Sequence, residues 1–259
     1  MGGGHRHGPG GALYLHGHSW VHRVPAHVKV VTLLLFVLVV VATPGTLRWT
    51  FLGYAFLLAI VARIAEVSLA TILRRMSVEI PFLLFAVLMP FISTGPRVEV
   101  LWFSLSVRGL EAAFVILVKA SLGVIASIIL AATTSSHDLL LGLQRLRMPE
   151  LIVQIASFMI RYAEVISGEM SRMSIARQSR CFEARGPRQW RVLGQSAGAL
   201  FIRSYERGER VHLAMLSRGF QGRMPLVSNT AALPAQWWLA LTLPLAAALV
   251  LLISWRAAR

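Results

Sequence analysis

The sequence predicts an all-α polytopic membrane protein with about five transmembrane helices, plus a helical segment outside the membrane between the last two. Three observations lead to this fold class. Hydrophobic residues make up 56% of the 259 positions and charged residues only 14%, whereas soluble domains contain about 25% charged residues. The hydrophobic residues gather in five separate runs. A long segment rich in arginine separates the fourth run from the fifth.

Each apolar run is expected to be a helix, because an unpaired backbone group in lipid costs several kcal/mol. The runs are Val28–Ala42, Trp49–Ala62, Ile80–Ile92, Ala112–Ala132 and Ala231–Trp255. Only the last two reach the roughly 20 residues that cross a bilayer core, so the first three need their flanks. A sixth span over Leu151–Ile160 stays open as an alternative, although Arg161 and Glu164 interrupt it.

The runs divide the chain into four predicted parts. Residues 1–27 form a flexible arm rich in His and Gly, 28–136 hold the first four spans, 137–225 form the basic segment, and 231–255 form the last span. Cytoplasmic loops of membrane proteins are enriched in Arg and Lys. This rule places the N-terminus and the basic segment on the cytoplasmic side of the membrane, which we expect to be a bacterial inner membrane. It also accounts for the net charge of +15 without a nucleic acid partner.

The basic segment is predicted to contain two amphipathic helices. Apolar residues recur every three or four positions in both, as on one face of a helix. The first helix has its stripe at Ile152, Ile155, Met159, Ala163, Ile166, Met170 and Met173, and the second at Leu193, Ala197, Leu200, Ser204 and Val211. Arg203, Arg207 and Arg210 lie on the other side of the second helix, where solvent exposure is expected.

The segment also nearly repeats itself at an offset of 38 residues. Residues 175–187 align with residues 213–225, so that Ser179-Arg180-Cys181 matches Ser217-Arg218-Gly219. Each copy is typical of a helix that ends at Ser-Arg, turns, and stops before a proline. An arginine there extends into water beside the negative end of the helix dipole. Two copies indicate that a pseudo-symmetric or dimeric partner offers two equivalent binding sites.

At this point the sequence resembles the transmembrane coupling (T) component of energy-coupling factor transporters, in particular the cobalt-type CbiQ branch. Three stretches carry the resemblance. Ser19–Lys29 is similar to the family's opening before its first span, and Leu143–Pro149 to its lead into the cytoplasmic helices. The third is the pair of signatures at Arg180 and Arg218. Together with the pattern of apolar runs, they cover nearly the whole chain.

The resemblance implies that the chain is the membrane scaffold of an ATP-driven importer of cobalt ions. It would link two ATP-binding cassette ATPase subunits to a membrane substrate-binding component. The chain would then be no enzyme and hold no cofactor, with ATP and Mg²⁺ bound by the partner subunits. It lacks the Gly-x-x-x-x-Gly-Lys-Ser/Thr loop of ATP-hydrolysing subunits. Two other classes stay open: a lipid-modifying membrane enzyme and a self-sufficient channel.

The resemblance also assigns the docking residues. The implied contacts to the ATPase subunits are Ser179, Arg180 and Cys181 in the first signature and Ser217, Arg218 and Gly219 in the second, with Arg185 as second choice. Cys181 stands where the family has Gly. Because Gly closes a helix in the left-handed conformation at little cost and Cys pays roughly 1 kcal/mol more, a different ending of the first helix is left open.

Three further features have two readings each. His5, His7, His16 and His18 have spacings that can chelate a transition metal, but a glycine-rich arm fixes no geometry, which favours a flexible tail. Lys119 inside the fourth run marks a functional site or a structural anchor. Gly123 and Ser127 form a small-residue pair that is suited to close helix packing or occurs by chance, as such pairs often do.

Overall fold

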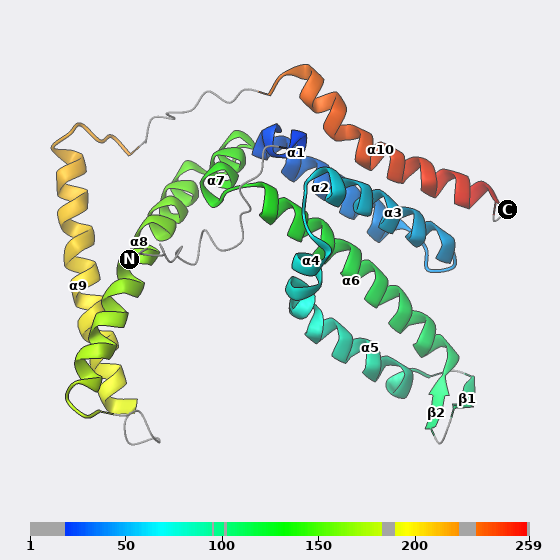
Figure 1. Ribbon diagram of the computed structural model, residues 1–259, viewed down its shortest axis with the longest axis horizontal. Helices are drawn as coiled ribbons and strands as arrows, with labels where there is room; N and C mark the ends of the chain where they lie inside the picture. The colour runs from blue at the N-terminus through cyan, green and yellow to red at the C-terminus, as the bar shows by residue number, and fades with distance from the viewer. Residues whose placement is uncertain (1–18, 95, 101–102, 183–189, 223–231, 258–259) are drawn as a thin grey trace, which may run out of the picture. The chain divides into compact units, whose positions relative to one another are not determined.

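The computed structural model describes residues 19–94, 96–100, 103–182, 190–222 and 232–257 (Figure 1). The helices are α1 (Trp20–Arg23), α2 (Ala26–Ala42), α3 (Arg48–Ile64), α4 (Leu69–Arg75), the 3₁₀ turn η1 (Met76–Glu79), α5 (Ile80–Ile92), α6 (Val107–Thr133), α7 (Ser136–Arg145), α8 (Glu150–Gln178), α9 (Trp190–Leu216) and α10 (Pro234–Ala257). The all-α membrane fold is thus confirmed. Its one addition is an antiparallel hairpin of β1 (Arg97–Val100) and β2 (Phe103–Ser106), with Arg97 opposite Ser106.

Within the described residues, four helical segments are long and apolar enough to cross a membrane: Leu69–Ile92, α6, α8 and α10. The first of them joins α4, η1 and α5, which supplies the flank that the third apolar run needed. With 17 residues each, α2 and α3 span only about 25 Å. The sixth span that the sequence left open, Leu151–Ile160, lies inside α8.

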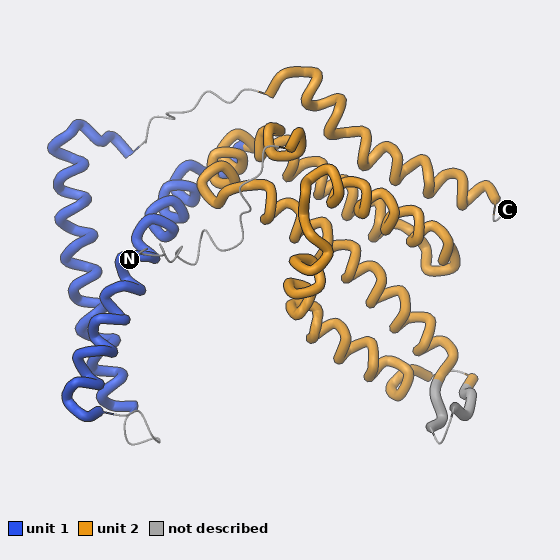
Figure 2. The backbone as a smooth tube through the Cα atoms, viewed as in Figure 1, with its two compact units in different colours: residues 1–12, 147–229 blue, residues 13–146, 230–259 orange. Residues whose placement is uncertain are grey.

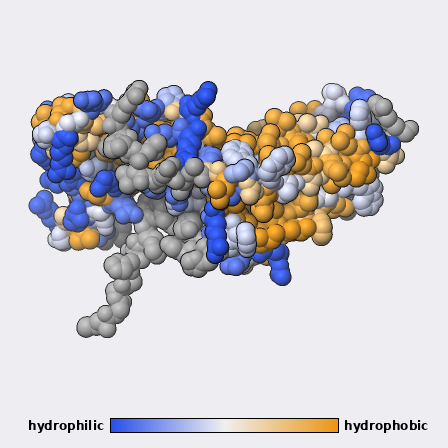
Figure 3. All heavy atoms as spheres, turned by 90° about the horizontal axis from the view of Figure 1, so that it is seen from above, coloured by the Kyte–Doolittle hydropathy of each residue, from blue (hydrophilic) through white to orange (hydrophobic). Residues whose placement is uncertain are grey.

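The chain forms two compact units (Figure 2). The membrane unit contains residues 13–146 and 230–259, and the helix-pair unit contains 147–229 together with 1–12. Hydrophobic residues cover most of the visible face of the membrane unit, whereas hydrophilic residues are frequent on the helix-pair unit (Figure 3). The boundary follows α7, where Arg147 has a positive φ of 65° and Pro149 stands just before α8.

The core of the membrane unit lies between α2, α3, α6 and α10. Tyr54 is fully buried there, with the rings of Phe36 and Phe51 edge-on to its own. Its hydroxyl lies 2.9 Å from the Thr43 hydroxyl, which also bonds the carbonyl of Val39. These two buried hydroxyls are therefore paired with each other, as a low-dielectric interior favours.

The two lysines of the chain join α2 and α6 at both ends. Lys29 Nζ in α2 donates to the carbonyl of Thr133 at the end of α6, at 2.7 Å. Lys119 Nζ in α6 donates to the carbonyl of Val41 at the end of α2, at 2.8 Å. The last carbonyls of a helix have no partner within it, and a cation there complements the helix dipole. Of the two readings of Lys119, this contact supports the anchor.

Glycine brings α5 and α6 together at Gly109, where a Cβ atom would lie 2.6 Å from the Pro90 Cα and 2.7 Å from the Met89 carbonyl oxygen. Of the two readings of Gly123 and Ser127, the structure supports a chance occurrence. A Cβ at Gly123 would meet no atom within 4 Å, and Ser127 is exposed. The small-residue pair therefore packs against no helix in the described part of the chain.

Candidate functional site

The basic segment folds into α8 and α9, and the two predicted apolar stripes lie on these helices. Two contacts set their direction. Gln154 Nε2, in the second turn of α8, donates to the carbonyl of Gly222, just after α9, at 3.0 Å. Farther along the same pair, Arg207 donates to Glu169. Both contacts follow one antiparallel register, so the end of α9 lies beside the start of α8.

The two signatures end their helices through the same hydrogen bonds, each displaced by 38 residues. In the first, Cys181 N donates to Gln178 O and Phe182 N to Arg177 O, at 3.0 and 3.1 Å; in the second, Gly219 N donates to Leu216 O and Phe220 N to Met215 O, both at 3.0 Å. This pattern is a Schellman ending. The hydroxyls of Ser179 and Ser217 also donate to equivalent carbonyls, those of Ala176 and Ala214.

Cys181 takes the left-handed position that Gly219 takes in the second copy. Their φ angles are 57° and 82°. The different ending that the sequence left open for the first helix is therefore not found. A side chain at this position costs roughly 1 kcal/mol, which the four hydrogen bonds of the ending offset. The Cys181 thiol is free and exposed.

Arg180 and Arg218 each precede the left-handed residue, and both are exposed. Each guanidinium extends from a helix end whose carbonyls carry partial negative charge. Because the helices are antiparallel, the two arginines lie at opposite ends of the pair (Figure 1). In this register Arg218 lies opposite Phe158 of α8, 22 residues before Arg180, or about 33 Å along the helix, so one binding pocket cannot take both.

Glu169 and Arg207 form the ion pair between the helices, which corrects the expectation that Arg207 is solvent-exposed. Their side chains are only 13% and 33% exposed. They are 38 residues apart, the same offset as the repeat, so they occupy equivalent positions in the two copies. Equivalent positions of two elements meet only at the axis that relates them. The ion pair therefore marks a pseudo-twofold axis, with one signature on each side.

The ion pair fixes the charge of Glu169. The hydrogen bond from Arg207 lowers the pKa of this carboxyl, and the nearby charges of Arg172 and Arg203 act in the same direction. A lowered pKa means that the contribution of the pair to stability is complete above the carboxyl's ordinary pKa. It is lost as the pH falls through the lowered value.

We therefore expect Glu169→Gln to destabilise the helix pair at neutral pH and to leave it less sensitive to acid below about pH 4. The double exchange Glu169→Arg with Arg207→Glu should restore stability, because the same contact forms with reversed partners. Thermal unfolding measured from pH 7 to pH 3 checks both results. Glu209→Gln, at an exposed position of α9, is the control, and an equal loss there would remove the special role of the pair.

The other predicted site residues lie outside the described residues: Arg185, and His5, His7, His16 and His18 of the arm. Among the residues that the structure describes, no group of three or more His, Cys, Asp or Glu side chains could hold a metal ion. Sequence reasoning did not single out Glu79. It is buried in the membrane unit, where it accepts a hydrogen bond from Ser121 of α6.

Comparison with known proteins gives consistent matches. Residues 17–228 match the family model CbiQ, described as cobalt transport protein. A cobalt transport protein CbiQ of Rhodobacter capsulatus is 31% identical over 79% of this chain and 78% of its own length. An energy-coupling factor transporter transmembrane protein EcfT of Staphylococcus aureus is 25% identical over 90% of both chains, and that of Brevibacillus brevis is 27% identical over 81% of this chain and 83% of its own.

Proposed function

Because the chain belongs to the CbiQ family of cobalt transport proteins, we propose that it is the coupling subunit of an ATP-driven importer. In this role it binds two ATPase subunits through α8 and α9. It also binds a membrane substrate-binding component beside its own membrane helices. ATP-driven closure of the ATPase pair then moves the helix pair and, through it, the membrane part. ATP and Mg²⁺ are held by the ATPase subunits.

The duplicated helix ending carries this proposal. Two identical endings, each with an exposed arginine, lie on either side of a pseudo-twofold axis. A pair of like ATPase subunits offers two like grooves, one for each arginine. An arginine fork binds carboxylates in a bidentate geometry, so we propose that each groove is acidic where the arginine enters.

Cobalt is the proposed substrate, on the grounds that the matching family and the Rhodobacter capsulatus relative are named for cobalt transport. The chain's own part in the transport is mechanical. The described residues contain no candidate metal cluster, so we assign metal capture to the membrane partner. Affinity purification of the full chain, with mass spectrometry of the proteins that co-purify, tests the proposal. ATPase subunits and a second membrane protein are the expected partners.

Cys181 tests the orientation without engineering, since it is the one cysteine of the chain and its thiol is exposed. The excess of arginine around it predicts a cytoplasmic location. A membrane-impermeant maleimide should label Cys181 in inverted vesicles and not in intact spheroplasts. Labelling in spheroplasts would place α8 and α9 on the outer side, where no ATPase can dock.

A further inference from the structure

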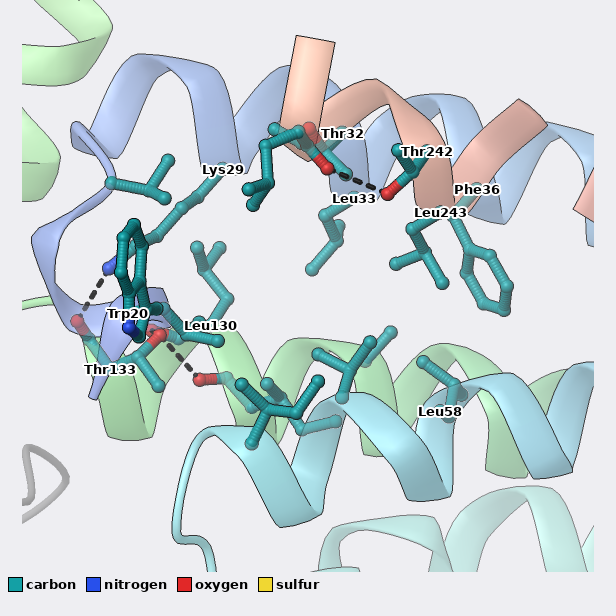
Figure 4. Close-up of a pocket in the computed structure, with 18 residues that line it drawn as sticks. Trp20, Lys29, Thr32, Leu33, Phe36, Leu58, Leu130, Thr133, Thr242 and Leu243 are labelled. Atoms are coloured by element: carbon teal, nitrogen blue, oxygen red, sulfur yellow. Dashed lines mark hydrogen bonds between the residues drawn. The ribbon is translucent and has the colours of Figure 1, made fainter. Parts of the chain in front are cut away.

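A groove of about 210 Å³ opens in the membrane unit between α1, α2, α3, α6 and α10 (Figure 4). It lies at the end of the unit where α2 begins and α6 ends. Its walls are apolar, with Leu33 and Phe36 from α2, Leu58 from α3, Ile129 from α6 and Leu243 from α10. None of the residues identified above as docking residues belongs to it.

The threonine hydroxyls in the wall already donate their protons. The hydroxyls of Thr32, Thr133 and Thr242 donate to carbonyls of their own helices, those of Val28, Ile129 and Leu239. A polar ligand would therefore find no hydroxyl donor along the groove, and burying its polar groups without partners would be costly. The interior of the groove suits hydrocarbon.

One end of the groove has a different character. Among the described residues that line it, Lys29 is the only charged one, and two of its three donors are taken by Thr133 and Thr134 at the end of α6. Trp20 stands beside it and is 71% exposed, as is common for tryptophan at the level of lipid headgroups. The groove is thus apolar along its length and has at one end the Lys29 ammonium group, which has one hydrogen-bond donor left.

We propose that this groove binds one acyl chain of an anionic phospholipid, whose phosphate lies against Lys29. A transmembrane helix of a partner is about 10 Å wide with its side chains and is too large for a groove of this volume. A single acyl chain is much thinner than a helix, and the anionic headgroup at its end is complementary in charge to Lys29. This inference does not depend on the proposed docking of ATPase subunits.

The test uses the purified full chain, stripped of lipid in mild detergent and titrated with phosphatidylglycerol, with phosphatidylcholine of the same acyl chains, and with oleate. Native mass spectrometry counts the bound molecules. We expect one phosphatidylglycerol per chain, held about fivefold more tightly than phosphatidylcholine, as one lysine near an anionic headgroup provides. Equal affinity for the two phospholipids would overturn the role of Lys29. Binding of oleate as tight as that of phosphatidylglycerol would make a free fatty acid the occupant.

Variants test the contributions of the headgroup and of the acyl chain to binding separately. Lys29→Met should lower the affinity for phosphatidylglycerol about fivefold, and Lys29→Arg should keep it. Lys119→Met removes the same charge from the other lysine cap, outside the groove, and should leave lipid binding unchanged. Ala240→Phe fills the groove and should abolish binding of both phospholipids, whereas Ala235→Phe, at an exposed position of the same helix, should not. Unchanged binding in Ala240→Phe would contradict the proposal.

Discussion

Reversing both signature arginines, by Arg180→Glu and Arg218→Glu, should abolish ATP-driven uptake while the chain still inserts in the membrane. In the proposed complex, each reversal would replace an attraction to an acidic groove by a repulsion and would leave the partner's carboxylate without its cation. The loss of such a pair at an interface costs on the order of 2–5 kcal/mol. Either reversal alone should loosen one ATPase subunit and strongly reduce transport, because the two arginines lie about 33 Å apart along the helix pair.

The controls are arginines with the same charge in other places. Arg203 is exposed on α9, away from its end, and its reversal should leave ATPase co-purification nearly unchanged. Arg185 is the second choice from the sequence and belongs in the same series. Arg180→Lys should be partly defective, because lysine keeps the charge and loses the planar fork. Equal losses at Arg203 and at the signatures would mean that overall positive charge holds the complex.

The second large effect is expected at Gly109→Ala. The new Cβ would lie 2.6 Å from the Pro90 Cα and 2.7 Å from the Met89 carbonyl oxygen, and neither backbone atom can turn away. Overpacking of this kind typically costs 1–3 kcal/mol, so α5 should separate from α6 and the melting temperature in detergent should fall. Gly123→Ala, on the same helix, should be neutral or stabilising, because its Cβ meets no atom within 4 Å. Equal stability of the two variants would contradict the close packing at Gly109.

The apolar runs predicted the membrane helices well, because in hydrocarbon the backbone N–H and C=O groups of a segment must hydrogen-bond with each other, as they do in a helix. The sequence was less informative where the contact depends on the fold. Gly109 and Gly123 are both glycines of α6, and only the packing of α5 shows that the close contact is at Gly109. The same holds for Lys119, whose partner at Val41 lies 78 residues away.

The helix endings were predicted closely, and the reason is local. The repeat identifies Arg180 and Arg218 as the last residues before the turn, and both helices end there through nearby backbone bonds. The ion pair of Glu169 and Arg207 was missed, because its formation requires the antiparallel register of α8 and α9. One signal was available: the two residues are separated by the offset of the repeat itself.

Cross-linking from the two helix ends tests the central claim most directly. The native Cys181 serves at the first end, and Gly219→Cys in a Cys181→Ser background at the second, since Cys181 already occupies the same backbone position. A short thiol-to-amine cross-linker applied to the assembled complex should join each cysteine to an ATPase subunit. Glu209→Cys in the same background, on the exposed side of α9, should give little product. Cross-links to ATPase subunits from Glu209→Cys alone, and from neither helix end, would contradict docking through Arg180 and Arg218.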